Sequence, residues 1–132
     1  MRGLEKLHVA LILGMMSVST GCSPTIERRA LLGKYVANHG KGLDAIELKH
    51  DGSYVYFYRS SSGKEFRNAG RWTFYRQDNA PRITFNDFVF GLGGYGGAKP
   101  GYWDVEIERS WRGELRLSLD PDLNYYYLKQ NQ

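Results

Sequence analysis

The chain has 132 residues, of which 42% are hydrophobic, 14% aromatic and 24% charged. This composition is typical of one globular domain and excludes both a disordered chain and two full-size domains. The single cysteine, Cys22, excludes an internal disulfide framework and a cluster of thiolate metal ligands, and the formal net charge of +4 does not by itself indicate nucleic-acid binding.

Residues 1–21 have the pattern of a signal peptide. Arg2 and Lys6 precede an apolar run from Leu7 to Val18. As a helix this run would be about 18 Å long, which is far short of the ~30 Å hydrocarbon core of a bilayer. We therefore expect these residues to direct export rather than to form a permanent membrane span.

The only cysteine follows that run in the segment Ser19-Thr20-Gly21-Cys22-Ser23. Small residues before a cysteine resemble the lipobox of bacterial lipoproteins, although Ser19 stands where that family usually has leucine. The resemblance implies that Cys22 becomes an N-terminus acylated with fatty acids such as palmitate. Ser23 is similar to the pattern for outer-membrane sorting. The alternative is ordinary signal-peptidase cleavage after Ser19 or Gly21, which would leave a free thiol.

Residues 22–31 are expected to form the acylated N-terminus and a short tether. From Pro24 to Leu32 the sequence favours one or two helical turns, with Ser23 or Thr25 as the N-cap and Gly33 as the stop. Three apolar residues would anchor this segment on the domain that follows: Ile26, Leu31 and Leu32.

After Gly33 apolar and polar residues alternate, and turn residues recur about every ten positions, as in an antiparallel β meander. A parallel sheet is excluded, because each crossover needs a dozen or more residues. Residues 32–132 are therefore expected to be all-β, with a closed or nearly closed barrel favoured and a sandwich as the alternative. Eight strands are predicted: Lys34–Asn38, Asp44–Lys49, Ser53–Arg59, Glu65–Arg76, Arg82–Phe90, Tyr102–Arg109, Glu114–Leu119 and Tyr125–Lys129.

The predicted strand Tyr102–Arg109 indicates which side chains face the core, because its apolar residues alternate with carboxylates. For this strand and the next to face one core, their loop must have odd length. A three-residue loop, Trp111-Arg112-Gly113, with a left-handed glycine meets this condition and places Glu108 opposite Arg116. Eight residues are expected to be mostly buried: Trp72, Phe74, Trp103, Val105, Ile107, Leu115, Leu117 and Leu119.

A second hairpin decides whether tyrosines line the interior. A three-residue turn, His50-Asp51-Gly52, would pair Leu48 with Tyr54 and would point Tyr54 and Tyr56 inward. A two-residue turn at Asp51-Gly52 would instead turn both rings outward. We favour the first arrangement.

The stretch Gly91 to Gly101 is rich in glycine and lacks the strand-to-helix context of a Rossmann or P-loop motif. One interpretation is a surface connection. The functional alternative is a flap over the mouth of the barrel with Tyr95 at its tip.

Three short motifs resemble those of the small lipocalin-like, or calycin-type, β-barrel lipoproteins of bacteria. They are Gly33-Lys34-Tyr35 at the start of the first strand, the segment Leu48 to Tyr54, and Gly70-Arg71-Trp72. In that family Gly-x-Trp or Gly-x-Tyr opens the first strand and an Asp-Gly-Thr-Tyr hairpin recurs. The resemblance implies a barrel that binds an apolar ligand or a protein, and it carries over no catalytic residue.

Side chains with catalytic or metal-binding chemistry form no recognised pattern. His39 and His50 lie beside turn glycines without metal-ligand spacing, and the run Ser60 to Lys64 is typical of a polar turn. The carboxylate row from Asp104 to Glu108 has the spacing of glycosidase acid pairs, but we expect it on the outer face, paired with nearby arginines. We therefore expect no enzyme, metal or cofactor, and no nucleic-acid partner, because the basic residues are dispersed.

Two classes of function remain. The first is a non-enzymatic lipoprotein of the bacterial envelope, on the periplasmic face of the outer membrane, whose barrel binds a small apolar or amphipathic ligand. The second is a protein-interaction module, such as a periplasmic inhibitor or immunity-type protein, that docks on an envelope protein through its loops. For the first class, the rings expected to contact an amphipathic ligand are Tyr54, Tyr56, Trp72, Trp103 and Tyr95.

Overall fold

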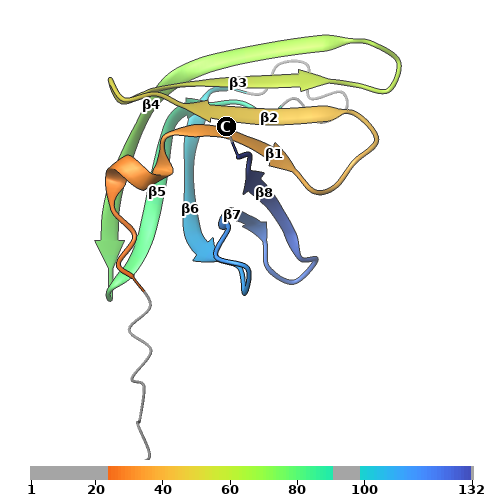
Figure 1. Cartoon of the computed structure of the whole chain (residues 1–132). Helices are drawn as coiled ribbons and strands as arrows, with labels where there is room; N and C mark the ends of the chain where they lie inside the picture. Colours follow the sequence, from red (N-terminus) through yellow and green to blue (C-terminus); the bar gives the residue numbers. More distant parts are fainter. Residues whose placement is uncertain (1–23, 91–98, 132) are drawn as a thin grey trace, which may run out of the picture.

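A computed structural model of the chain describes residues 24–90 and 99–131. Eight antiparallel strands follow one another around a closed barrel, because the first strand also pairs with the last (Figure 1). The predicted all-β barrel is confirmed. Within the described residues, no helix is long and apolar enough to cross a membrane. The strands are β1 (Gly33–Ala37), β2 (Leu43–Leu48), β3 (Ser53–Arg59), β4 (Glu65–Gln77), β5 (Ala80–Phe88), β6 (Gly101–Arg109), β7 (Leu115–Asp120) and β8 (Tyr125–Lys129).

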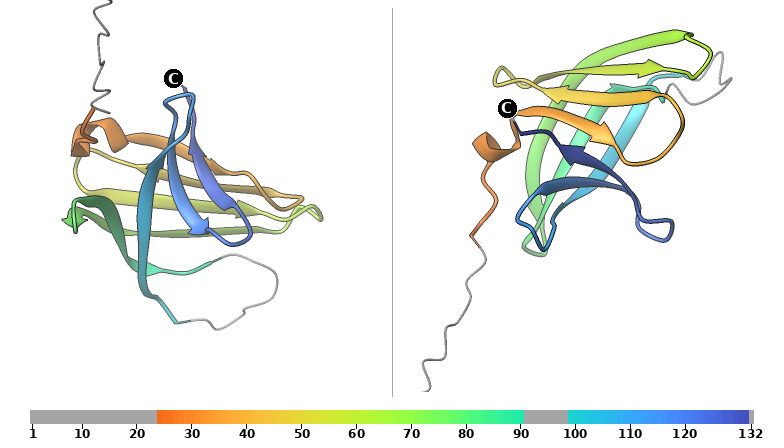
Figure 2. Two further views of the ribbon diagram at one scale, coloured as in Figure 1. Left: turned by 90° about the horizontal axis from the view of Figure 1, so that it is seen from below. Right: turned by 45° about the vertical axis from the view of Figure 1, so that its right-hand side comes forward.

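The two ends of the barrel are built differently. The N-terminal segment, residues 24–32, packs at one end together with the turns that join β2 to β3, β4 to β5 and β6 to β7. We call this the closed end. The opposite end, which we call the loop end, carries the connections from β1 to β2, β3 to β4, β5 to β6 and β7 to β8. In Figure 2, β6, β7 and β8 run across the strands β1 to β4 on the other side of the interior.

The N-terminal segment contains the short 3-10 helix η1 (Arg28–Leu31), whose N-cap is Glu27 without a side-chain capping bond. The predicted cap Thr25 is therefore wrong, and Ser23 lies outside the described residues. The Tyr35 hydroxyl donates to the Leu31 carbonyl at 2.8 Å, and Arg76 donates to the carbonyl of Ile26. The first bond satisfies a carbonyl that the single helical turn leaves free, and the two bonds together fix the segment to β1 and β4.

Both predictions of turn length are confirmed. Glu108 pairs with Arg116 across the β6–β7 turn, where Gly113 has a φ of +83°. Leu48 pairs with Tyr54 across the β2–β3 turn, where Gly52 also has a φ of +83°. Glycine adopts this left-handed conformation without steric cost and so closes a three-residue turn. Tyr54 and Tyr56 consequently point inward and are fully buried.

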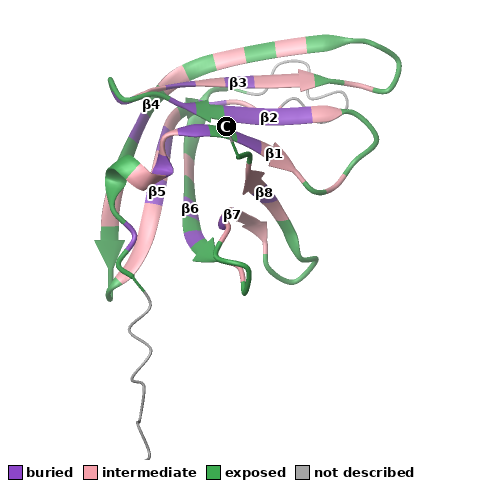
Figure 3. Ribbon diagram, in the orientation of Figure 1, coloured by how far each residue is buried: buried purple, intermediate pink, exposed green. Residues whose placement is uncertain are grey.

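Aromatic rings fill the centre of the barrel. The Phe88 ring lies 4.9 Å from that of Tyr56, 5.5 Å from Phe85 and 4.8 Å from Trp103, measured between ring centroids. Buried positions alternate with exposed or half-buried ones along β3 and β6 (Figure 3). Of the eight residues predicted in the core, five are buried: Trp72, Val105, Ile107, Leu115 and Leu117. The other three are half-buried and pack against them: Phe74, Trp103 and Leu119.

The long strand β4 changes partner along its length. Its first half pairs with β3 and its second half with β5. Gly70 lies where the change occurs, and a Cβ there would approach the Asn86 carbonyl oxygen to 2.4 Å. Next to it β5 has a bulge, with Asp87 at a φ of +59° and a register shift between Phe85 and Phe88. The bulge turns both of these phenylalanines into the barrel.

Candidate functional site

Asp44 is the only buried charged residue in residues 24–90 and 99–131, with 4% of its surface exposed. It lies at the loop end of β2, two residues before Ile46 and four before Leu48. Side chains at alternate positions of a strand share a face, so all three point into the barrel. Opposite Asp44 on β3 is Tyr58.

The two carboxylate oxygens of Asp44 have different surroundings. Oδ1 accepts a hydrogen bond of 2.8 Å from the Tyr127 hydroxyl, which comes from β8 on the other side of the loop end. Oδ2 is buried and accepts no hydrogen bond from the described part of the chain. A buried polar atom without a partner costs about 1–3 kcal/mol, and such atoms are rare in native structures. The buried, unpaired Oδ2 of Asp44 therefore lowers the stability of the folded protein.

Burial raises the pKa of Asp44 above its usual value, because the charged carboxylate loses its hydration. The hydroxyl groups of Tyr127 and Tyr56, and the nearby His39, act in the opposite direction without cancelling the rise. The pKa of Tyr127 is raised as well, first by burial and then by the adjacent Asp44 carboxylate. Tyr127 therefore stays protonated and remains a hydrogen-bond donor to Asp44.

His39, in the connection from β1 to β2, lies near this carboxyl group. Its ring stacks on Tyr125 at 4.3 Å between centroids and meets the edge of Tyr127 at 6.5 Å. Asn38 holds the connection in place, because its side chain donates to the Asn124 carbonyl and accepts from the Tyr126 amide. The position of His39 beside a turn glycine, without metal-ligand spacing, is typical of a solvated loop residue. His39 is instead half-buried among aromatic rings.

An apolar wall adjoins the carboxyl group. Trp103 lies 5.9 Å from Tyr127 and 4.8 Å from both Phe88 and Phe90, between ring centroids. Trp103 and Phe90 are only half-buried, so part of each ring remains accessible. The loop end thus combines accessible aromatic surface with one buried acid.

The residues predicted to contact a ligand do not all lie together. Tyr54, Tyr56 and Trp103 each pack against Phe88. The Tyr54 hydroxyl is already bonded, at 2.8 Å to the Asn86 carbonyl and at 3.2 Å to Asn68. Burial, followed by the charge of Asp87, raises its pKa.

Trp72 makes its contacts at the closed end. Its indole nitrogen donates to the Lys49 carbonyl at 3.1 Å, and the Arg28 guanidinium lies 4.4 Å from its ring. Two further predicted site residues, Cys22 and Tyr95, lie outside the described residues.

Sequence reasoning did not single out Asp44 or Tyr127. A signal for Asp44 was present, because it has the same parity as the apolar Ile46 and Leu48 and would therefore face inward. No comparable signal linked it to Tyr127, which is 83 positions away in the chain.

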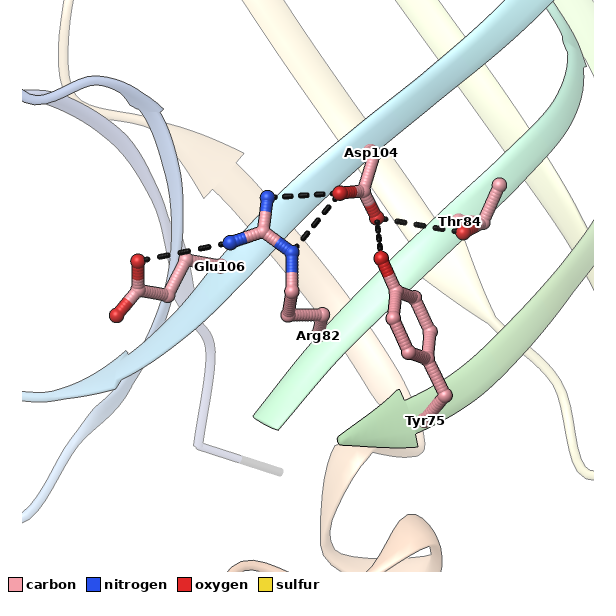
Figure 4. Close-up of polar contacts among 5 residues, drawn as sticks. All are labelled: Tyr75, Arg82, Thr84, Asp104 and Glu106. Carbon is pink, nitrogen blue, oxygen red and sulfur yellow. Dashed lines mark hydrogen bonds and ion pairs between the residues drawn. The ribbon is translucent and has the colours of Figure 1, made fainter. Parts of the chain in front are cut away.

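The carboxylate row on β6 has a structural role (Figure 4). Asp104 accepts hydrogen bonds from the Tyr75 hydroxyl at 2.7 Å and from Arg82 Nε at 2.8 Å, and Glu106 lies 3.7 Å from Arg82. Thr84 adds a bond of 3.3 Å to Asp104. From the sequence we expected Arg109, Arg112 and Arg116 to pair with this row, whereas the observed partner, Arg82, comes from β5.

Partial burial acts to raise the pKa of Asp104, but the hydrogen bonds from Tyr75, Arg82 and Thr84, together with the charge of Arg82, outweigh it and lower the pKa. A carboxylate held in its charged form in this way is poorly suited to general acid catalysis. The network connects β4, β5 and β6 on the outer face of the barrel.

Two further features complete the description of the chain's possible sites. A cavity of about 330 Å³ lies at the closed end, between Ala30 and Leu32 of the N-terminal segment and the residues Arg109, Glu114 and Lys129. Among residues 24–90 and 99–131, no three His, Cys, Asp or Glu side chains are grouped so that they could hold a metal ion.

Comparison of the chain with models of protein families, with curated proteins and with solved structures found no match.

Proposed function

We propose that this protein is a non-enzymatic lipoprotein of the bacterial envelope that binds a small, uncharged amphipathic molecule at the loop end of its barrel. The observation that carries the proposal is the buried Asp44 Oδ2, which has no hydrogen-bond partner in the described residues and lies next to half-exposed aromatic rings. A ligand with a hydroxyl or amide group would donate to this oxygen and would remove the cost of leaving it unpaired.

The apolar part of such a ligand would lie on Trp103 and Phe90. Burying apolar surface contributes roughly 25 cal/mol per Å², so a chain of several methylene groups against these rings would supply most of the affinity. An anionic head group is disfavoured, because it would repel the Asp44 carboxylate whenever that group is ionised. The proposed ligand therefore has a neutral, hydrogen-bond-donating head and an aliphatic or aromatic body.

The proposed ligand lies toward the loop end rather than deep in the barrel. The rings of Tyr54, Phe85 and Phe88 are in mutual contact at the centre, with centroids 5.2 to 5.7 Å apart. Rings at this spacing leave no room between them for a ligand. Binding above Phe88 requires no opening of this central packing.

Anchoring through Cys22 is the second part of the proposal. It is supported by the apolar run before Cys22, by the small residues around it and by the absence of any partner cysteine in the sequence. Each methylene group of an acyl chain that enters a bilayer contributes about 0.8 kcal/mol, so several chains on one residue give stable attachment. Cys22→Ser should release the protein from membranes, and labelled fatty acid should be incorporated only into the wild type.

Binding can be tested by titrating the purified protein with a monoacylglycerol and recording tryptophan fluorescence. We expect a saturable change in the wild type and roughly tenfold weaker binding in Asp44→Ala, the loss expected when one hydrogen bond to a charged group is removed. The matched control is Asp104→Ala, which removes a carboxylate from the outer face. A non-saturable response, or equal binding by the wild type and Asp44→Ala, would overturn the proposal.

A second candidate function is supported by the exposed apolar residues of the loop end. Tyr102 is 84% exposed and Leu123 is 59% exposed, and both lie beside the connections that surround the site. Exposed large apolar residues of this kind are common where proteins bind one another. If the monoacylglycerol titration fails, docking of an envelope protein on these residues becomes the better explanation. Tyr102→Ser and Leu123→Ser should then abolish its capture without changing the melting temperature.

A further inference from the structure

We propose that the closed end of the barrel is a membrane-docking surface, which binds anionic lipid headgroups through its basic side chains and places Trp111 at the membrane–water interface. The proposal deepens the proposed function, on which it rests for the position of the bilayer. It assigns a partner to a face that the ligand-binding proposal does not use. Three observations support it: the distribution of charge, the position of Trp111 and the attachment of the N-terminal segment.

The positive charge of the described chain is concentrated at the closed end. Residues 24–34, 47–55, 71, 76–81, 108–116 and 128–131 form this end and contain ten basic against six acidic side chains. The corresponding loop-end residues, 36–44, 58–67, 87–90, 99–102 and 119–126, contain five of each. The basic residues of the closed end are Arg28, Arg29, Lys34, Lys49, Arg71, Arg76, Arg109, Arg112, Arg116 and Lys129.

Little of this charge is neutralised within the protein. Among the residues described, the ion pair at the closed end is Arg29 with Glu27, at 3.1 Å. Several of the other basic groups donate to backbone carbonyls instead, such as Arg71 to Asp51 at 3.0 Å and Arg109 to Gly113 at 2.9 Å. A carbonyl positions a guanidinium without cancelling its charge. The closed end therefore presents a net positive surface, which is complementary to anionic headgroups.

Trp111 lies at the tip of the β6–β7 turn and is 86% exposed. The Arg112 guanidinium lies 4.7 Å from its ring. Exposed tryptophan next to a basic residue is unfavourable in water but typical of membrane–water interfaces, where the ring lies among the headgroups and the cation contacts phosphate. The turn thus has the composition of an interfacial anchor.

The N-terminal segment connects this surface to the proposed lipid anchor. Ile26 is buried, and its carbonyl accepts a hydrogen bond from Arg76, so the chain is fixed to the barrel from this residue onward. Cys22 precedes Ile26 by four residues, which span at most about 14 Å when fully extended. An acylated Cys22 would therefore hold the closed end close to the bilayer. The loop end, with Asp44, would face away from the membrane.

The test uses the full protein purified from the cell envelope and placed in vesicles that contain brominated lipids, which quench nearby tryptophan. The share of Trp111 in the signal is the difference between the wild type and Trp111→Phe. In vesicles of phosphatidylethanolamine and phosphatidylglycerol, Trp111 should be strongly quenched, and in phosphatidylcholine alone the quenching should be much weaker. High salt should reduce the quenching, because the attraction is electrostatic.

A pair of charge reversals provides the matched control. Lys49→Glu with Arg112→Glu changes the closed end, whereas Lys41→Glu with Lys64→Glu makes the same change of net charge at the loop end. The first pair should lower the ratio of docked to undocked protein roughly tenfold, and the second should leave it unchanged. Equal effects of the two pairs, or equal quenching on both kinds of vesicle, would overturn the proposal.

Mass spectrometry of the same preparation separates this inference from the anchoring on which it rests. An acylated protein whose Trp111 is not quenched on anionic vesicles would contradict the docking surface while leaving the anchor in place. An unacylated protein that sediments with anionic but not with phosphatidylcholine vesicles would support the surface and contradict the anchor.

Discussion

The closed end and the loop end of the barrel differ in how their buried oxygen atoms are paired. At the closed end the Tyr35 hydroxyl and the Arg76 guanidinium each bond to a backbone carbonyl of the N-terminal segment, and Leu31 is fully buried. At the loop end the Asp44 Oδ2 is buried without such a partner. The closed end has an unpaired donor of its own, the buried Arg116 Nε, but the loop end is where a buried oxygen is left unpaired and can accept a hydrogen bond from a ligand.

The largest expected effect on stability comes from removing a buried side chain at the closed end. Leu31→Ala should lower the free energy of unfolding by about 2–5 kcal/mol, because it leaves a cavity beneath η1. Leu123→Ala, at an exposed position of the loop end, should change it by less than about 0.5 kcal/mol. Urea denaturation measures both values. Similar losses for the two variants would show that the ends do not differ in this way.

A smaller effect is expected from a single hydrogen bond at the closed end. Tyr35→Phe removes the bond from the hydroxyl to the Leu31 carbonyl and should cost about 1 kcal/mol, because that carbonyl is left unpaired. The matched variant Tyr102→Phe removes an exposed hydroxyl and should be neutral. Thermal melts of the two variants give the comparison, and an unchanged melting temperature for Tyr35→Phe would contradict a stabilising role for this bond.

The loop end should respond to pH through Asp44. Its folded-state pKa lies above the usual 3.8, so the native state binds its proton more tightly than the unfolded state. Stability is therefore fully present below pH 3.8 and falls as the pH rises through the folded-state value. The side chain of Asp44→Asn does not ionise, so this variant should be more stable than the wild type at pH 7, by about 1 kcal/mol.

Denaturation at several pH values tests whether stability changes with pH in the predicted direction. The stability difference between Asp44→Asn and the wild type should shrink as the pH is lowered toward 4. Asp104→Asn is the opposite case, because the pKa of Asp104 is lowered and its charged form stabilises the fold at neutral pH. An Asp44→Asn variant that is less stable than the wild type at pH 7 would refute the account of the loop end.

Much of the barrel could be predicted from local sequence signals. Gly52 and Gly113 set the lengths of their turns. These lengths, together with the alternation of apolar and polar residues along the strands, predict the register of two hairpins. The bulge in β5 could not be predicted in this way, because it is held by Asn68 of β4, which donates to the Asp87 carbonyl and accepts from the Val89 amide. Such contacts depend on how the barrel closes.

The candidate site was predicted only in part for the same reason. Tyr56 and Trp103 were identified because alternation places them inside, and both lie next to Phe88. Asp44 was treated as the polar first residue of a strand, and its contact with Tyr127 exists only because the barrel brings β2 and β8 to the same end. A buried acid whose partner is distant in sequence leaves no local pattern to detect.

The central claim, that the Asp44 carboxyl group is the polar part of a binding site, can be tested most directly by ¹³C NMR of the aspartate carboxyl carbons. In the free protein Asp44 should titrate above its usual pKa. Addition of a monoacylglycerol should then shift the Asp44 carboxyl resonance with a saturable dependence on concentration, while the Asp104 resonance should stay in place. An Asp44 that titrates at its ordinary value, and whose resonance is unmoved by the ligand, would contradict the account.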